Sequence, residues 1–195
     1  MAISSLRTFL IANIGVFLLY CFSYWFVDAV ISPIQKTILP GSVAFVSLVF
    51  LPSGVRIVAF ILFGWRALLP ILLGSLLCNQ YFWGVQDTSL LWLLSASSTL
   101  VFYFAMKVSQ WLGLSVFLED TLPRLPPFRT IILVTVVASA LNGIISSAIF
   151  ATYVAYLNGG LVAMEYVLGD LLGTLCFMVI LSALFNFMNK QQIRL

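Results

Sequence analysis

Apolar residues along this chain gather into six long stretches, and the short intervals between them hold most of the charged residues. A helix needs roughly 20 apolar residues to cross the hydrocarbon core of a bilayer. The pattern therefore predicts an all-α integral membrane protein, a compact bundle of about six transmembrane helices at residues 9–31, 38–63, 67–83, 89–106, 130–153 and 161–187. No remaining interval could hold a soluble domain of even about 50 residues, so residues 1–195 form one transmembrane domain.

The second and third predicted spans differ from ordinary lipid-facing helices. The stretch from Leu51 to Asn79 holds two prolines, three glycines and two arginines in nearly unbroken apolar sequence. Helix breakers are tolerated at membrane depth only where protein groups or trapped water satisfy the freed backbone groups. We therefore place this stretch inside the bundle, with the second span broken at Pro52–Gly54 and a turn at Gly64-Trp65-Arg66. Either the broken span crosses the membrane once, or its two halves dip in and return to the same side.

The positive charges predict the orientation of the bundle, because lysines and arginines collect in short cytoplasmic loops. If six spans alternate, one side of the membrane receives Arg7, Arg66, Lys107, Arg124, Arg129, Lys190 and Arg194. The opposite side receives Lys36 together with Asp28 and Asp87. Both termini are then expected to be cytoplasmic.

The composition excludes several classes of function. Apolar residues make up 63% of the chain and charged residues 8%, against roughly 25% charged residues in soluble domains. The net charge of +3 fits cytoplasmic loops rather than nucleic-acid binding, since the sequence has no basic run that would neutralise phosphates. The bilayer is therefore the expected partner, and nucleic acid is not.

The chain has no histidine, and its three cysteines, Cys21, Cys78 and Cys176, are far apart in the sequence. We interpret them as small buried thiols and expect no metal and no cofactor. A serine nucleophile would need a lysine or carboxylate as its base, and the sequence offers no such pair at a suitable place. We therefore expect no catalytic residue and no enzymatic activity.

Three ionisable residues, Arg56, Glu165 and Asp170, lie within apolar sequence. Each costs roughly 2.5–3.5 kcal/mol at a helix centre unless it finds a partner or water. At about 1.5 Å of rise per residue, Arg56 and Asp170 differ in depth by only about 5 Å across a core of about 30 Å. An ion pair between them near mid-membrane is the sharpest structural prediction.

The same arithmetic brings Asn142 to a similar level and Asn79 and Glu165 nearer the outer surface. Together with Arg56 and Asp170, these residues would form a polar cluster open to the outside. As a function, the cluster would bind a small molecule or a lipid headgroup, with the N–H groups that follow Gly54 available to an anionic group. As architecture, the ion pair would hold two helices together and Glu165 would simply reach the outer interface. Both interpretations stay open.

Small residues and prolines are assigned to packing and turns rather than to a site. Gly169 and Gly173 have the GxxxG spacing that lets helices approach closely. Packing within the bundle is one use of that spacing and dimerisation is the other. The full set of structural residues is Pro52, Gly54, Gly64, Arg66, Pro70, Gly74, Gly169 and Gly173.

The stretch LPSGVRIVAFILFGWRALLPILLGSLLCN, followed later by VLGDLLGTLCFMVIL, resembles the bacterial membrane-associated sensor domain of the first type. The family's motif positions correspond here to Pro52, Gly54, Gly64, Arg66, Pro70, Gly74, Asn79, Gly169, Asp170 and Gly173. The resemblance covers about residues 10–188 and implies a sensory, ligand-binding module in a bacterial cytoplasmic (inner) membrane. Such modules are usually fused to a histidine kinase or a cyclic-dinucleotide enzyme. Because this sequence ends shortly after its last span, we expect it to signal to a separate enzyme.

A second family fits the same size and topology. The chain also looks like the substrate-binding component of energy-coupling-factor vitamin transporters, mainly in its architecture and in Gly169-Asp170-Leu171-Leu172-Gly173. That resemblance implies uptake of a vitamin or another small solute, the outward polar cluster as its site, and an energising module as the partner.

Overall fold

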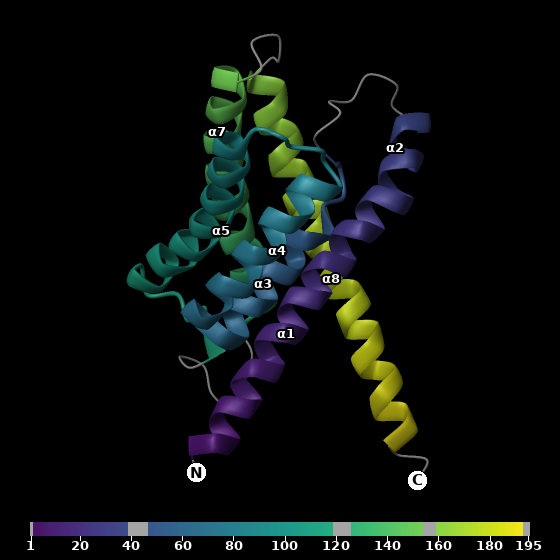
Figure 1. Ribbon diagram of the computed structural model, residues 1–195. Coiled ribbons are helices and arrows are strands. Elements are labelled where there is room, and N and C mark those ends of the chain that lie inside the picture. The colour runs from purple at the N-terminus through teal and green to yellow at the C-terminus, as the bar shows by residue number, and fades with distance from the viewer. Residues whose placement is uncertain (1, 39–46, 119–125, 154–158, 193–195) are drawn as a thin grey trace.

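The computed structural model describes residues 2–38, 47–118, 126–153 and 159–192, and within these ranges the chain is helical with short loops and no strands (Figure 1). The elements are α1 (Ala2–Phe26), a π-helical stretch (Val27–Ile31), α2 (Ser32–Ile38), α3 (Leu51–Phe63), a 3₁₀ turn (Gly64–Ala67), α4 (Leu68–Tyr81), α5 (Thr88–Trp111), α7 (Phe128–Tyr153) and α8 (Gly159–Gln192). The predicted all-helical membrane class is confirmed.

Among the described residues, five helical stretches are long and apolar enough to cross a membrane: Arg7–Ile38, Leu51–Tyr81, Thr88–Trp111, Phe128–Tyr153 and Val162–Met188. The last three correspond to the predicted spans 89–106, 130–153 and 161–187. The predicted count of six is not reproduced by length and composition, because α3 and α4 fall in one continuous helical stretch.

The first helical stretch continues past residue 31, where the sequence was expected to leave the membrane. A proline has no N–H to donate, and its ring crowds the preceding turn of an α-helix. Here the turn directly before Pro33 is π-helical, and the N–H of Ser32 donates to the carbonyl of Val27, five residues back. The wider turn allows the helix to continue past Pro33 to Ile38.

The second predicted span, 38–63, is not a single broken helix. Helix α3 begins at Leu51 with Pro52 in its first turn, where a missing N–H leaves no hydrogen bond unmade. Residues 47–50 precede it without helical structure, and residues 39–46 lie outside the described part of the chain. The break therefore comes before Leu51, and the predicted break at Pro52–Gly54 is wrong by a few residues.

Helices α3 and α4 form a hairpin. At the predicted turn, Gly64 has φ 54° and ψ −135°, a backbone conformation that residues with a side chain rarely adopt. The rings of Phe50, just before α3, and Trp83, just after α4, have centroids 5.8 Å apart. A straight helix spanning the same 31 residues would be about 47 Å long. The two arms therefore run in opposite directions and bring their far ends together.

Glycines allow the hairpin to pack closely against its neighbours. A Cβ atom at Gly74 of α4 would lie 2.8 Å from the ring of Tyr20 on α1, and one at Gly173 of α8 would overlap the backbone of Phe50. The N–H of Phe50 also donates to the carbonyl of Gly169 at 2.9 Å. Gly169 and Gly173 thus face the start of α3 within the bundle. Gly169 lies about 15 Å along α8 from the first residue of that helix, Gly159. Because the start of α3 contacts Gly169, α3 begins within the bundle and not at its end.

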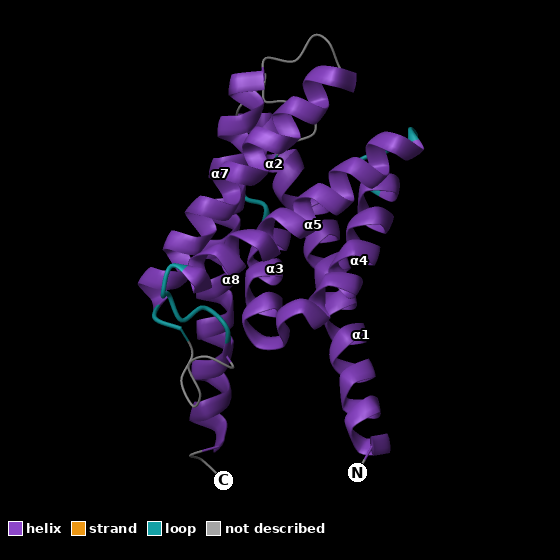
Figure 2. Ribbon diagram, turned by 90° about the vertical axis from the view of Figure 1, so that its left-hand side faces the viewer, coloured by secondary structure: helices purple, strands orange, loops and turns teal. Residues whose placement is uncertain are grey.

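Both described ends of the chain lie at the same end of the bundle, and the first half of α1 and the last half of α8 diverge toward them (Figures 1 and 2). These diverging halves carry large exposed apolar side chains, including Leu10, Ile14, Leu184, Phe185 and Phe187. Exposed apolar surface of this kind is expected for helices that face lipid.

Candidate functional site

Four of the five predicted site residues are buried together in the middle of the bundle. Arg56 on α3, Asn79 on α4, Asn142 on α7 and Asp170 on α8 are each only 1–3% exposed. We call these four residues the central polar cluster. Each is held by hydrogen bonds that connect different helices, so the cluster links most of the bundle.

Arg56 is bound to α1. Its Nε and Nη2 atoms donate to the hydroxyl oxygen of Tyr20 at 3.1 and 2.6 Å. The guanidinium carbon also lies 5.1 Å from the ring centroid of Phe102 and 5.7 Å from that of Phe50, within the range of cation–π attraction. Aromatic faces and one phenol therefore surround this cation.

Asn79 connects three helices through its amide. The hydroxyl of Tyr24 on α1 donates to Asn79 Oδ1 at 2.6 Å. Asn79 Nδ2 in turn donates to the hydroxyl oxygen of Ser95 on α5 at 2.8 Å. Both Asn79 amide groups are thus satisfied, and α1, α4 and α5 are joined at one level.

Asp170 is bound to α7 and α3. Asn142 Nδ2 donates to Asp170 Oδ2 at 2.9 Å. The hydroxyl of Ser53, in the first turn of α3, donates to the backbone carbonyl of Asp170 and lies 3.1 Å from the hydroxyl of Thr174. Since Ser53 is three residues before Arg56, the position of α8 is coupled directly to that of the arginine.

The predicted ion pair between Arg56 and Asp170 is not formed. Both residues are described, and no guanidinium nitrogen comes within 4.0 Å of a carboxylate oxygen. Tyr20 is the hydrogen-bond partner of Arg56, and Asn142 is that of the Asp170 carboxylate. Arg56 Nη1, Asn142 Oδ1 and Asp170 Oδ1 are all buried without a hydrogen-bond partner.

A cavity of about 20 Å³ lies within the cluster, and its lining includes Arg56, Asn79 and Asn142. That volume has room for about one water-sized molecule. The rings of Tyr24, Phe50 and Trp83, which we call the aromatic triad, also line it, with centroids 5.1–5.8 Å apart. In this structure the cluster is closed, and an opening to the outside stays a prediction.

Two of the predicted site residues, Asp170 and Glu165, do not line this cavity. Asp170 is hydrogen-bonded to Asn142, which does line it, and Glu165 is half-buried on α8. Five residues separate it from Asp170, which corresponds to about 140° around a helix, so the two carboxylates face different directions.

Sequence reasoning missed Tyr20 and Tyr24, which are 0% and 1% exposed. Their spacing of four residues puts both hydroxyls on one face of α1, a signal that could have been read from the sequence. The cysteines also differ from expectation, because only Cys78 is buried, Cys21 is half-buried and Cys176 is exposed.

The family model MASE1, which describes a membrane-associated sensor domain, matches residues 15–195. The chain belongs to the MASE1 family. This confirms the resemblance drawn from the proline, glycine and aspartate positions. No curated protein and no solved structure matches the chain significantly. Within this MASE1 domain, the motif positions Gly54, Asn79, Gly169, Asp170 and Gly173 all lie in or beside the contact between the α3–α4 hairpin and its neighbours.

Proposed function

We propose that this MASE1 domain senses a small polar molecule at the central polar cluster and reports its binding as a change in helix packing. The observation that supports the proposal is that three atoms of the central polar cluster, Arg56 Nη1, Asn142 Oδ1 and Asp170 Oδ1, are among the buried side-chain atoms without a hydrogen-bond partner. A buried polar atom without a partner costs about 1–3 kcal/mol. A molecule that accepts from Arg56 and donates to the two oxygens would remove these costs together.

Binding at this place acts on three helices, because the three atoms belong to α3, α7 and α8. A ligand shifts a conformational equilibrium only by its differential affinity for the two states. The aromatic triad lines the cavity, and in the proposal the open and closed states differ in whether Tyr24, Phe50 and Trp83 are packed together.

Helix α8 is the proposed output element. It is continuous from Asp170 to Gln192, which is about 33 Å at 1.5 Å per residue. A displacement of α8 at Asp170 would be carried along that length, as in other helix shifts. We propose that the receiver is a separate signalling enzyme at the cytoplasmic side of a bacterial inner membrane.

The proposed topology has six passes and cytoplasmic termini. The α3–α4 hairpin counts as two passes, one that ends with α3 and one formed by α4. The location of both described ends at one end of the bundle supports this arrangement. The transport alternative receives no support from the family match.

A thermal-shift screen of the purified domain against vitamins, sugar phosphates and other small polar compounds tests the proposal. A compound at 100 times its Kd stabilises a folded state by about 2.7 kcal/mol. We expect Asn142→Leu, in the cavity lining, and Asp170→Asn, which removes the charge that accepts from Asn142, to abolish the shift. Glu165→Gln, on a different face of α8 from Asp170, should retain it. A stabilising compound that acts equally on all three variants would place its site elsewhere.

A further inference from the structure

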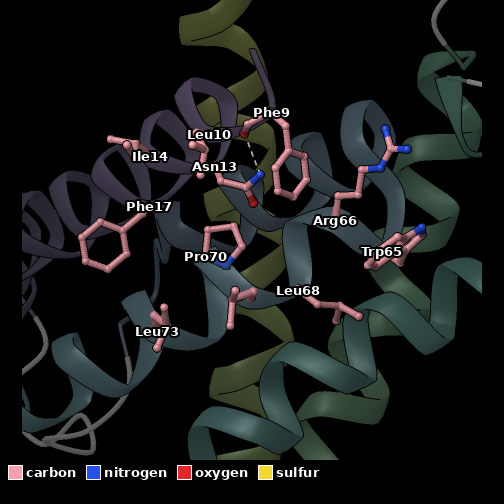
Figure 3. A pocket seen from close by; sticks show the side chains of 11 residues that line it. Phe9, Leu10, Asn13, Ile14, Phe17, Trp65, Arg66, Leu68, Pro70 and Leu73 are labelled. Carbon is pink, nitrogen blue, oxygen red and sulfur yellow. Dashed lines mark hydrogen bonds between the residues drawn. The ribbon is translucent and has the colours of Figure 1, made fainter. Parts of the chain in front are cut away.

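The end of the bundle near the chain termini carries an apolar groove between α1 and the α3–α4 turn. The groove has a volume of about 510 Å³, and its lining includes Phe9, Ile14, Phe17 and Arg66 (Figure 3). Leu69 also lines it. Ile14 is 56% exposed and Leu69 65% exposed, so the groove opens toward the hydrocarbon of the membrane. Arg66 is its cationic boundary.

A second apolar groove, of about 500 Å³, lies between α5 and α7. Its lining includes the apolar residues Leu100, Phe104 and Leu141, together with Lys107 and Trp111. Leu100 and Phe104 are each 55% exposed. Each of the two grooves therefore combines lipid-exposed apolar walls with one cation and one tryptophan, Trp65 beside Arg66 in the first and Trp111 near Lys107 in the second.

The two cations meet in a smaller cavity between the grooves. This cavity, of about 70 Å³, is lined by both Arg66 and Lys107, together with Trp65, Gln110 and Phe117. Arg66 thus borders the first groove and the small cavity, and Lys107 borders the second groove and the same cavity. The small cavity therefore adjoins both grooves, the first at Arg66 and the second at Lys107.

Neither cation is neutralised within the described residues. Lys107 Nζ donates to Gln110 Oε1 at 2.9 Å and lies 4.7 Å from the ring centroid of Phe117. Arg66 is exposed, and among the residues that the structure describes no carboxylate lies within 4.0 Å of either side chain. Two like charges that share one cavity attract an anion of matching size.

We propose that this series of hollows binds an anionic phospholipid, with its phosphate between Arg66 and Lys107 and its acyl chains in the two grooves. Acyl chains fill any groove that faces the bilayer, so the grooves alone select nothing. Basic pockets between transmembrane helices select phospholipid headgroups by charge, and the two tryptophans suit the level of the headgroups. A free phosphate ion would use the cavity but neither groove, which favours the lipid.

The proposal predicts a measurable preference for anionic over zwitterionic lipid. We expect native mass spectrometry of the full chain, titrated with phosphatidylglycerol, cardiolipin or phosphatidylcholine, to show tighter binding of the two anionic lipids. Arg66→Gln and Lys107→Gln should each lower the anionic preference about fivefold, which corresponds to about 1 kcal/mol per cation near the membrane surface. The double variant should lower it about 25-fold.

Arg129→Gln is the matched control, because Arg129 is an exposed cation at the beginning of α7 that lines none of the three hollows. It should leave the preference unchanged, and Arg66→Lys, which keeps the charge, should retain most of it. The proposal is overturned if Arg66→Gln and Lys107→Gln act no more strongly than Arg129→Gln. It is also overturned if inorganic phosphate displaces the lipid at equal concentration, since the grooves would then contribute nothing.

Discussion

Arg56 on α3 donates two hydrogen bonds to a single acceptor, the hydroxyl oxygen of Tyr20 on α1, from Nε at 3.1 Å and from Nη2 at 2.6 Å. The phenol thereby takes the place that the depth arithmetic assigned to a carboxylate. A hydrogen bond to a buried charge is worth about 1.5–3 kcal/mol, and in a membrane no bulk water replaces it. Tyr20 therefore offsets part of the free-energy cost of burying the Arg56 guanidinium.

Removing that one oxygen should destabilise the bundle. We expect Tyr20→Phe to lower the free energy of unfolding by about 1.5–3 kcal/mol, because it leaves Nε and Nη2 of Arg56 without an acceptor while it keeps the ring. Thermal or denaturant unfolding in detergent measures the loss. Tyr153→Phe, at a 41% exposed position, is the control and should change little. Equal stability of the Tyr20→Phe variant and the wild type would contradict the proposed role.

Asp170 should be coupled more strongly to Asn142 than to Arg56. A double-mutant cycle on residues in contact gives interaction energies of about 0.5–3 kcal/mol, and Asn142 Nδ2 lies 2.9 Å from Asp170 Oδ2. We expect the cycle of Asn142→Ala with Asp170→Ala to fall in that range. The cycle of Arg56→Ala with Asp170→Ala should give a smaller coupling, because no direct contact joins them. If the Arg56–Asp170 coupling energy exceeded the Asn142–Asp170 coupling energy, the predicted ion pair would be supported instead.

Substitution of alanine for glycine should have opposite effects on stability at two helical positions, Gly173 and Gly15. A Cβ at Gly173 would overlap the backbone of Phe50, which cannot move without displacing the start of α3. Overpacking of this kind costs about 1–3 kcal/mol or more. A Cβ at Gly15 meets nothing within 4 Å, so Gly15→Ala should be neutral or stabilise α1 by up to about 1 kcal/mol. Unfolding of both variants under identical conditions measures the contrast.

The sequence predicted four of the polar residues that are buried in the bundle, Arg56, Asn79, Asn142 and Asp170. Span boundaries and the rise per residue give each residue an approximate depth, and Asn142 and Asp170 are joined by a hydrogen bond. Rotation about each helix axis is not determined in this way, which is why the direct partners of Arg56 and Asp170 were not predicted. Tyr20 and Tyr24 were missed because a tyrosine in an apolar helix resembles a lipid-facing residue until its neighbours are known.

The start of α3 is indicated in the sequence by Pro52. A proline is disfavoured inside a helix and favoured in its first turn, so Pro52 indicates a helix that begins at Leu51. The predicted interruption rests on the long, mostly apolar run of residues 38–63, in which Arg56 is the only charged residue. The position of the start at depth depends on Gly169 and Gly173, which lie more than 110 residues away in the sequence, and local patterns carry no information on that contact.

The proposed six-pass topology makes a labelling prediction. In a background without Cys21, Cys78 and Cys176, we expect a cysteine at Thr37, exposed near the end of α2, to react with an impermeant maleimide from outside intact cells. A cysteine at Leu112, 78% exposed just after α5, should react only after permeabilisation. The two positions differ because the chain would pass the membrane three times between them, in a pass that ends with α3, then through α4 and then through α5. If Leu112 were outside as well, α3 and α4 could not count as two passes, and the assignment of cytoplasmic termini from the positive charges would fail with it.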